Sequence, residues 1–308
     1  MRVVWISFVP PSTLDQPSSD IASLRSRITS PARAIAGSTL TYVGPGVNRR
    51  TLLEQFAEAD AAVFGRLLDA SMAQTVLELA TAIGKQGVKV IVDYSEDYSA
   101  HPELASVYRS LIQAADVVAA SNSALADILR SQTPVPVVVV GDPVEGERGE
   151  PRASSRRPPR LLWFGPAHNL AALRFALDQL TQRRAHFALS VLTSPGAGAE
   201  NLGHRFRAWS TEAVLEELHA CDAVVLPGVT IRFCQGIWAG RLVIDRPSPA
   251  YGEIGTYGWL GDDIAEGVEW LLENPQLATE RIRAGQEWIA AHTSLDAIAR
   301  AWELVAAR

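Results

Sequence analysis

The feature that most constrains the fold is a regular alternation of short apolar runs with helical segments, which occurs twice along the 308-residue chain. In the first half we expect strands at 3–9, 61–65, 88–94, 116–121 and 135–142, and helices at 20–36, 70–84, 103–115 and 123–130. Continuous Val/Ile runs joined by helices are typical of parallel strands that are buried on both faces of a sheet. The first half is therefore predicted to form a layered α/β domain.

A polar segment interrupts this alternation at 146–160. It is rich in Pro, Gly and Arg and has no helical or strand periodicity, which favours a linker between domains. Its arginines are interpreted as solvated charges rather than a phosphate site. The predicted organisation is a first domain at 1–150, a linker at 151–160, a second domain at 161–290 and a C-terminal helix at 291–308.

The alternation resumes after the polar segment. We expect strands at 160–165, 186–193, 222–228 and 241–246, helices at 169–184, 210–221 and 231–239, and an almost entirely helical tail from 262. Two successive halves of this kind describe a pair of Rossmann-like domains. Ligands of such sheets bind at the carboxyl ends of the strands.

Composition and charge narrow the classes of function. The formal net charge is -6, and basic residues are dense only at 152–160, whereas nucleic-acid-binding domains usually carry a basic face. A nucleic-acid partner is therefore not expected, and a small or neutral ligand fits better. No G-x-G-x-x-G pattern follows a predicted strand, which argues against a dinucleotide-dependent dehydrogenase.

The location of the protein is predicted from two further observations. The chain has two cysteines, Cys221 and Cys234, too few for a disulfide framework. No apolar run approaches the roughly 18–20 residues of a membrane span, and the apolar N-terminal stretch ends at Pro10. We therefore expect a cytoplasmic protein without a membrane span.

A first candidate ligand segment follows the strand at 160–165. Gly165 ends this strand and permits close approach of a ligand, and a helix is expected from about Asn169. Free backbone N–H groups at a helix start attract phosphate, and His168 can add a contact. The alternative interpretation is an ordinary turn in which Asn169 caps the helix.

A second candidate segment covers 228–255. It contains Arg232 and Gln235 on a short helix, an Ala239-Gly240 turn, a hydrophobic strand, and a Pro-containing loop with Tyr251. This order resembles the bacterial GT-B glycosyltransferases of the broad retaining class that uses nucleoside-diphosphate sugars. The resemblance implies that Arg232 pairs with the donor diphosphate and that Tyr251 lies in the donor-binding loop.

One residue departs from the family pattern. The family's helix carboxylate, which holds a hydroxyl of the donor ribose or sugar, falls on Gln235. An amide can donate and accept hydrogen bonds but supplies no charge. This departure implies an altered donor, weaker donor binding, or lost activity.

Other segments resemble the same family. The stretch 206–227 is similar to its nucleobase-binding region, where Trp209 either stacks on the base or packs in the core. The stretch 19–37 is similar to its acceptor-side segment, so Asp20, Ser23, Arg25 and Arg27 are expected to border the cleft between domains. The alternative is a helix with a solvated basic face. The resemblance also implies that the C-terminal helix returns to the N-terminal domain.

Glycosyl transfer requires stabilisation of the negative charge that develops on the phosphate leaving group. The resemblance implies that cationic side chains and helix N-termini provide it without a metal or another cofactor, and no D-x-D triplet follows a predicted strand. Asp93, Glu96 and Asp97 follow a strand of the first domain and are expected to face the acceptor. Asp97, His101 and Arg25 are the candidate catalytic residues, with Asp97 as a base in an inverting variant. The alternative is that these loop carboxylates are solvated.

Three hypotheses remain open from the sequence. The first is a metal-independent glycosyltransferase that moves a sugar from a nucleoside-diphosphate donor of unspecified base to an unidentified acceptor. The second is a catalytically silent GT-B protein that binds a nucleotide or a partner, which Gln235 permits. The third is another protein with two Rossmann-like domains, such as a nucleotide-sugar epimerase or a periplasmic-binding-type sensor.

Overall fold

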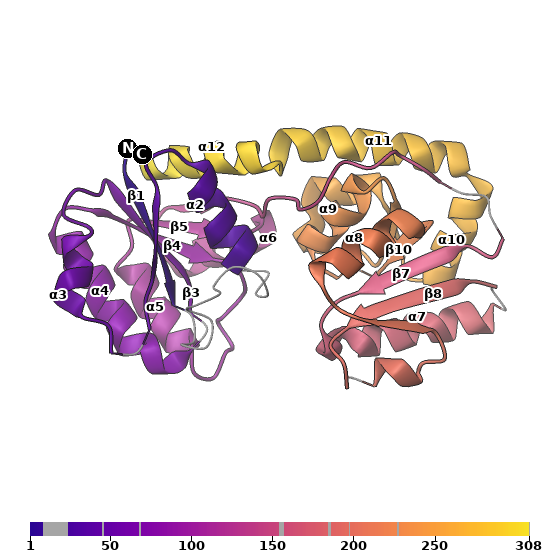
Figure 1. Ribbon diagram of the computed structural model, residues 1–308, viewed down its shortest axis with the longest axis horizontal. Coiled ribbons are helices and arrows are strands. Elements are labelled where there is room, and N and C mark those ends of the chain that lie inside the picture. The colour runs from indigo at the N-terminus through magenta and orange to yellow at the C-terminus, as the bar shows by residue number, and fades with distance from the viewer. Residues whose placement is uncertain are drawn as a thin grey trace. The chain divides into compact units, whose positions relative to one another are not determined.

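The computed structural model describes residues 1–8, 24–44, 46–67, 69–153, 157–183, 186–196, 198–226 and 228–307. The chain divides into two compact units, one made of Met1–Pro143 with Thr293–Arg308 and the other of Val144–His292. Each unit contains a six-stranded parallel sheet with helices on both faces (Figure 1). Two Rossmann-like α/β units were predicted, and this fold class is confirmed.

The sheet of the first unit has the strand order β2-β1-β3-β4-β5-β6. Its strands are β1 (Val3–Phe8), β2 (Thr39–Tyr42), β3 (Ala61–Leu67), β4 (Lys89–Tyr94), β5 (Val117–Ala120) and β6 (Val137–Val139). Its helices are η2 (Arg25–Thr29), α2 (Ser30–Ala34), α3 (Arg49–Glu54), η3 (Ala70–Met72), α4 (Ala73–Lys85), α5 (Ala105–Gln113), α6 (Ser123–Gln132) and α12 (Leu295–Ala307).

Strand β1 shows why the first unit needs two helical layers. Successive side chains of a strand point to opposite faces, so Val4 and Ile6 pack into the core beneath α4 and α5, whereas Trp5 enters the core on the other face. There the ring of Trp5 meets that of Trp302 from α12 edge-on, with centroids 5.0 Å apart. The C-terminal helix thus completes the core of the N-terminal sheet, as predicted.

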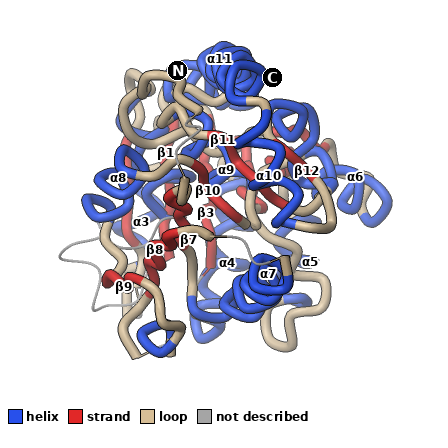
Figure 2. Tube along the Cα trace, turned by 90° about the vertical axis from the view of Figure 1, so that its right-hand side faces the viewer, coloured by secondary structure: helices blue, strands red, loops and turns tan. Residues whose placement is uncertain are grey.

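The sheet of the second unit has the strand order β12-β11-β10-β7-β8-β9. Its strands are β7 (Arg160–Phe164), β8 (Ala188–Thr193), β9 (Arg205–Ala208), β10 (Ala223–Val225), β11 (Leu242–Asp245) and β12 (Trp259–Leu260). Its helices are η4 (Ala167–Asn169), α7 (Leu170–Gln182), η5 (Ala199–Asn201), α8 (Thr211–Ala220), α9 (Thr230–Trp238), η6 (Pro249–Tyr257), α10 (Ile264–Glu273) and α11 (Pro275–His292). Figure 2 shows α7 and α8 on opposite sides of the strands.

The order of these strands defines where a ligand can bind. The chain runs from β7 outward to β8 and β9, and then returns to the other side of β7 to form β10, β11 and β12. The direction of winding therefore changes between β7 and β10. In open parallel sheets, ligands bind beyond the carboxyl ends of the strands at such a switch point.

The boundary between the units lies before the segment that we expected as a linker. Residues 144–153 belong to the second unit, where the Gly149 N–H donates to the Trp238 carbonyl at 2.9 Å and the Arg152 N–H donates to that of Gly240 at 3.0 Å. A Cβ on Gly240 would lie 2.1 Å from the Glu150 carbonyl oxygen. The absence of periodicity thus reflects a segment without helix or strand, whose backbone packs against the end of α9.

Three strands were not predicted: β2, β9 and β12, which have four, four and two residues. Each lies at or near an edge of its sheet, where only part of the side chains is buried. A short, half-exposed strand carries a weak apolar pattern.

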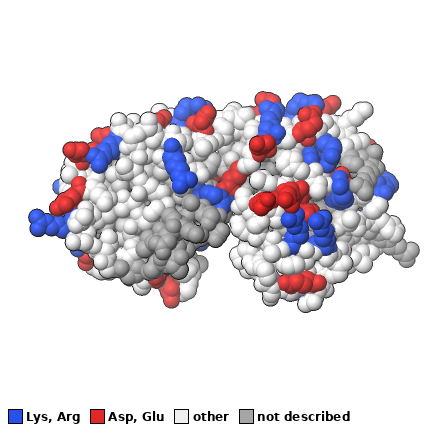
Figure 3. Space-filling view, viewed as in Figure 1, with Lys and Arg blue, Asp and Glu red and all other residues white. Residues whose placement is uncertain are grey.

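Charged side chains do not segregate by sign on the face shown in Figure 3, where basic and acidic residues are interspersed. Within the described ranges, no helix combines the length and the apolar character needed to cross a bilayer.

Candidate functional site

Arg232 lies at the switch point of the second sheet. It belongs to the first turn of α9, and its Nη1 donates to the carbonyl of Phe164, the last residue of β7, at 3.4 Å. A Cβ on Gly165 would lie 2.7 Å from this Nη1. Because Gly165 has no side chain, the guanidinium of Arg232 can occupy the space beside it. Gly165 and Arg232, which were both predicted to bind the donor, therefore lie next to each other.

The surroundings of Arg232 favour an anionic ligand. Burial lowers the pKa of its guanidinium, and the nearby Tyr251 and Asp245 offset this only in part. A partly desolvated cation attracts an anion more strongly than a cation in bulk water does. Bidentate recognition of phosphate oxygens is also the geometry for which a guanidinium is best suited.

Asp245 fixes the backbone near Arg232 through hydrogen bonds to residues before α9 and after β11. Its Oδ2 accepts hydrogen bonds from the Gly228 N–H at 3.0 Å and from the Tyr251 hydroxyl, and its Oδ1 accepts from the Arg246 N–H at 2.7 Å. Burial, followed by the charge of Asp245, raises the pKa of Tyr251. Tyr251 is buried and its hydroxyl donates to Asp245. This residue, which was predicted to lie in the loop that binds the nucleotide-sugar, therefore stabilises that loop from the protein interior.

The backbone at the end of β10 is strained. Leu226 has a φ of 49°, a left-handed conformation that is uncommon for a residue with a Cβ. Its side chain is buried and its N–H donates to the Ile244 carbonyl at 2.9 Å, so the surrounding core enforces this conformation. Such strain is concentrated at functional sites, and here it immediately precedes the loop that leads into α9.

Gln235 is hydrogen-bonded to a carboxylate that was not recognised from the sequence. Its Nε2 donates to Oε2 of Glu145 at 3.3 Å. The indole N–H of Trp238 donates to the Gly146 carbonyl at 3.0 Å. Because Arg232, Gln235 and Trp238 are spaced by three residues, they share one side of α9. The segment that begins at Glu145 therefore follows the same side of the helix as Arg232.

The other predicted donor residues have different positions. His168 and Asn169 lie in η4, directly after β7; His168 is exposed and the Asn169 side chain does not cap α7. Trp209 follows the edge strand β9, is half-buried, and packs against the core formed with α8 and α9. His168, Asn169, Gly165 and Arg232 are thus grouped around the end of β7, whereas Trp209 lies two strands away.

Two of the predicted catalytic residues shape the turn after β4. Asp97 is exposed and its Oδ1 accepts a hydrogen bond from the Ser99 N–H at 2.9 Å. Nδ1 of His101 accepts from the N–H groups of Glu103 and Leu104 at 3.3 and 3.2 Å, at the start of α5. Arg25, the third, begins η2, a single π-helical turn, and is half-buried. Their catalytic roles remain predictions.

The expectation that Arg27 borders a cleft and that Asp93 faces an acceptor was wrong. The two side chains are 1% and 0% exposed and form an ion pair inside the first unit. Nε of Arg27 donates to Asp93 Oδ1 at 3.0 Å, and its Nη1 donates to the Val140 carbonyl at 2.5 Å. Asp20 and Ser23, from the same predicted segment, lie outside the described residues.

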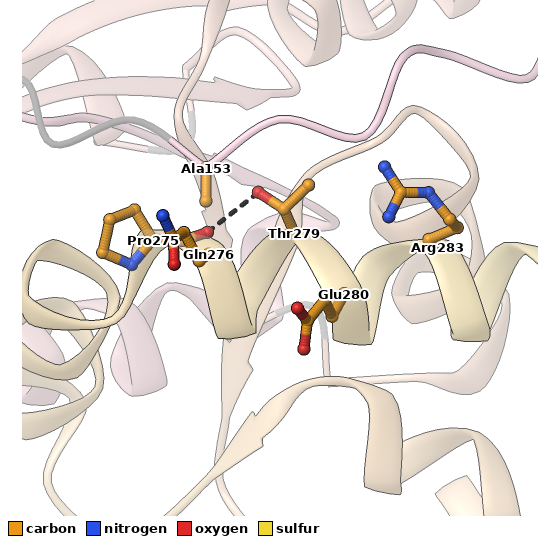
Figure 4. A pocket seen from close by; sticks show the side chains of 6 residues that line it. All are labelled: Ala153, Pro275, Gln276, Thr279, Glu280 and Arg283. Atoms are coloured by element: carbon orange, nitrogen blue, oxygen red, sulfur yellow. Dashed lines mark hydrogen bonds between the residues drawn. The ribbon is translucent and has the colours of Figure 1, made fainter.

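Two further features do not contribute to this site. In the described part of the chain, no three His, Cys, Asp or Glu side chains cluster so as to hold a metal ion. Figure 4 shows an open hollow at the start of α11, lined by Ala153, Pro275, Gln276, Thr279, Glu280 and Arg283. Its residues come from a helix and the 144–153 segment rather than from strand ends, and Thr279 donates to the Pro275 carbonyl within its own helix.

Comparison with known proteins gives a structural likeness without a sequence match. No protein-family model and no curated protein sequence matches the chain. Among solved structures, the Anabaena protein HepE in complex with UDP is similar over 99% of each chain, with a TM-score of 0.74 and 11% identity. An alpha-glucosyltransferase in complex with UDP-glucose and DNA containing an abasic site is similar over 99% of each chain, with a TM-score of 0.67 and 9% identity.

A third similar structure is the lipopolysaccharide outer core galactosyltransferase WaaB, over 98% of each chain, with a TM-score of 0.60 and 12% identity. These identities show the fold: the chain has the two-domain α/β architecture of GT-B glycosyltransferases along nearly its whole length. The predicted fold resemblance is thereby confirmed.

Proposed function

We propose that the protein is a glycosyltransferase that binds a nucleoside-diphosphate sugar at the carboxyl end of the second sheet. The observation that carries this proposal is the guanidinium of Arg232, held over Gly165 at the switch point between β7 and β10. The GT-B fold sets the chemical context, since HepE binds UDP and UDP-glucose in structures of similar fold. UDP is therefore the first nucleotide proposed for this site.

In the proposed reaction, an acceptor hydroxyl oxygen forms a bond to the sugar C1 while the bond between C1 and the diphosphate oxygen breaks. The bonding pair remains on the diphosphate as a negative charge, and the hydroxyl proton passes to a base, for which Asp97 is the candidate. Arg232 is placed to stabilise this charge without a metal, together with backbone N–H groups at the start of α9. We place the acceptor against the first unit, where Asp97, His101 and Arg25 are the candidate groups. His101 offers Nε2, because its Nδ1 already accepts two backbone hydrogen bonds.

Ligand-induced thermal stabilisation tests the donor site. A ligand that binds only the folded state at 100 times its Kd adds about 2.7 kcal/mol of stability. We expect UDP, compared with GDP, ADP, CDP and TDP, to raise the melting temperature of the wild type, and Arg232→Ala to reduce the shift by about half or more. Arg174→Ala, an exposed arginine of α7, is the matched control and should keep it. If no nucleotide at millimolar concentration shifts the wild type, the donor-site proposal is wrong.

A second test concerns Gly165. An alanine there would place Cβ 2.7 Å from Arg232 Nη1 and 3.4 Å from Trp163 Cζ2, so the guanidinium must move. We expect Gly165→Ala to weaken UDP binding by about fivefold, corresponding to about 1 kcal/mol of packing strain. An unchanged Kd would mean that the position of the guanidinium over β7 is unimportant for the ligand.

A silent nucleotide-binding protein is the second candidate function, and Gln235 in place of the family carboxylate favours it. Release of UDP from UDP-glucose or UDP-galactose, measured in EDTA with a panel of sugar, lipid and peptide acceptors, separates the two. Turnover that depends on Arg232 supports the transferase. Tight UDP binding with no UDP release above the buffer rate would support the silent protein.

A further inference from the structure

We propose that the second unit has an anion site at the amino ends of β7 and β11, where the guanidinium groups of Arg152, Arg160 and Arg241 bind a phosphate group. Arg160 is the first residue of β7, and Arg241 directly precedes β11. The strands of this sheet are parallel, so the site lies at the edge opposite to the carboxyl ends near Arg232. It is therefore separate from the donor site and does not depend on the proposed function.

Two of the guanidinium groups meet at the end of α8. Nη2 of Arg241 donates to the His219 carbonyl at 3.0 Å, and Nη2 of Arg152 donates to the same carbonyl at 3.3 Å. The Arg152 nitrogen also donates to the Cys221 carbonyl at 3.3 Å. Nη1 of Arg241 donates to the Gly240 carbonyl at 2.9 Å, which fixes this side chain further. Because the two groups share one carbonyl oxygen, two positive charges lie next to each other.

Arg160 joins this cluster through Asp222, which follows the end of α8. The Arg160 N–H donates to Asp222 Oδ2 at 2.8 Å, and the Asp222 N–H donates to the Arg160 carbonyl at 2.7 Å. The Arg160 side chain is partly exposed, and its Nε lies 3.6 Å from Oδ2, which makes an ion pair without a hydrogen bond. Within the described ranges, Asp222 is the one carboxylate that forms an ion pair with any of the three arginines.

The positive charge of the cluster exceeds the negative charge around it. The end of a helix carries about half a negative elementary charge, and Asp222 adds one, so three guanidinium groups leave an excess of about 1.5 positive charges. Burial lowers the pKa of Arg241, an effect that Cys221 and Asp222 oppose. The positive charges of Arg152 and Arg160 lower this pKa further. A bound anion would offset this repulsion between like charges.

Two of the guanidinium groups also hold N–H donors that the fold does not use. Nε of Arg241, a residue that is 5% exposed, and Nε of Arg160 are shielded from solvent and have no hydrogen-bond partner among the described residues. Such donors are rare in folded proteins and call for an explanation such as a bound ion or water. Arg152 is exposed and donates through Nη2 alone, so its other N–H groups are available to a ligand.

The chemistry of the cluster favours phosphate over other anions. A guanidinium group donates two parallel hydrogen bonds to a phosphate, and clusters of arginines are a recurring means of phosphate recognition. A phosphate monoester carries between 1.5 and 2 negative charges at about pH 7, which matches the excess positive charge more closely than a carboxylate does. The sequence favoured solvated arginines at 146–160, because the buried Arg241 comes from a distant part of the chain.

Isothermal titration calorimetry with inorganic phosphate tests this site. The 308-residue chain with Arg232→Ala is the background, so that phosphate bound at the donor site does not contribute. We expect saturable binding, and Arg152→Gln combined with Arg160→Gln should weaken it by at least about tenfold, as for the loss of hydrogen bonds to a charged group. Arg174→Gln, which removes an exposed arginine of α7, should leave the Kd unchanged.

A single variant protects the test against a folding defect. Arg160→Gln removes a side chain that forms no hydrogen bond with the described residues, and it should weaken phosphate binding by at least about threefold. Glycerol 3-phosphate, titrated in parallel, distinguishes a free anion from the phosphate of a larger molecule, and tighter binding of either supports the site. An unchanged Kd in Arg160→Gln, or no saturable binding of either probe at millimolar concentration, would overturn this proposal. The donor site would be unaffected, because its test measures UDP.

Discussion

Each unit carries an arginine near the carboxyl end of its parallel sheet, and the two arginines have opposite surroundings. Arg27 in the first unit is fully buried, and burial, which would lower its pKa, is outweighed by Asp93 and Asp142, so its pKa is raised. Arg232 in the second unit is half-buried, and burial outweighs Tyr251 and Asp245, so its pKa is lowered.

The difference lies in what the neighbouring carboxylates do. Asp93 is bound directly by Arg27, and Asp142 lies 3.7 Å from Arg27 Nη1, so the charge of Arg27 is neutralised within the core. Asp245, by contrast, is bound by Tyr251, Gly228 and Arg246. The comparison teaches that one residue type at a similar topological place is locked in a buried ion pair in one unit, whereas in the other it is half-buried and is the group that we propose binds an anion.

Breaking the buried ion pair between Arg27 and Asp93 should give the largest loss of stability. Arg27→Met leaves the Asp93 charge buried without its partner, and we expect the free energy of unfolding to fall by about 3–5 kcal/mol in urea denaturation. Arg33→Ala, an exposed arginine of α2, should change it by less than about 0.5 kcal/mol.

A double variant sharpens this prediction. Arg27→Met with Asp93→Leu removes both buried charges and should recover most of the lost stability, because desolvation of the pair offsets much of its attraction. A loss below about 1 kcal/mol for Arg27→Met alone would contradict the clamp.

Replacing Arg232 by methionine should weaken nucleotide binding and leave the stability of the fold nearly unchanged. Arg232→Met removes a partly desolvated charge, so we expect the free energy of unfolding to stay within about 1 kcal/mol of the wild type. Its affinity for UDP should fall by about 10- to 100-fold, corresponding to about 1.5–3 kcal/mol for hydrogen bonds to a charged group. Chemical denaturation and calorimetry measure the two quantities. A stability loss comparable to that of Arg27→Met would show that both arginines are structural.

Removing one hydroxyl group from the loop that contains Tyr251 should give a smaller loss of stability. Tyr251→Phe removes the hydroxyl that donates to Asp245, a residue that is 4% exposed, and we expect a loss of about 1–2 kcal/mol in unfolding free energy. Unchanged stability together with lost UDP binding would instead make Tyr251 a direct ligand contact.

The smallest expected effect has the opposite sign. Gly84 lies within α4, and a Cβ there would meet only Val90 Cγ2, at the ordinary contact distance of 3.7 Å. Gly84→Ala should raise the unfolding free energy by about 0.5–1 kcal/mol through helix propensity and leave UDP affinity unchanged. A destabilising result would mean that the end of this helix is constrained by more than local propensity.

Much of the fold follows from patterns in neighbouring residues. The Val/Ile runs predicted strands β4 and β7 within one residue at each end, because continuous apolar runs of this kind are typical of parallel strands that are buried on both faces. Ser210 was predicted to cap a helix, and its Oγ accepts a hydrogen bond from the Ala213 N–H at 3.0 Å. The short edge strand β9 was missed because it is half-exposed, so its pairing with β8, rather than an apolar run, distinguishes it from a loop.

The sequence by itself determined the class of fold and the two residues, Gly165 and Arg232, that follow strands of the second sheet. The tertiary structure decided which charged side chains are buried in ion pairs and which stay partly exposed. Arg27 and Asp93 are 66 residues apart, and Glu145 and Gln235 are 90 residues apart. Pairings over such separations form only when parallel strands are brought together by their crossover helices, so no local pattern encodes them.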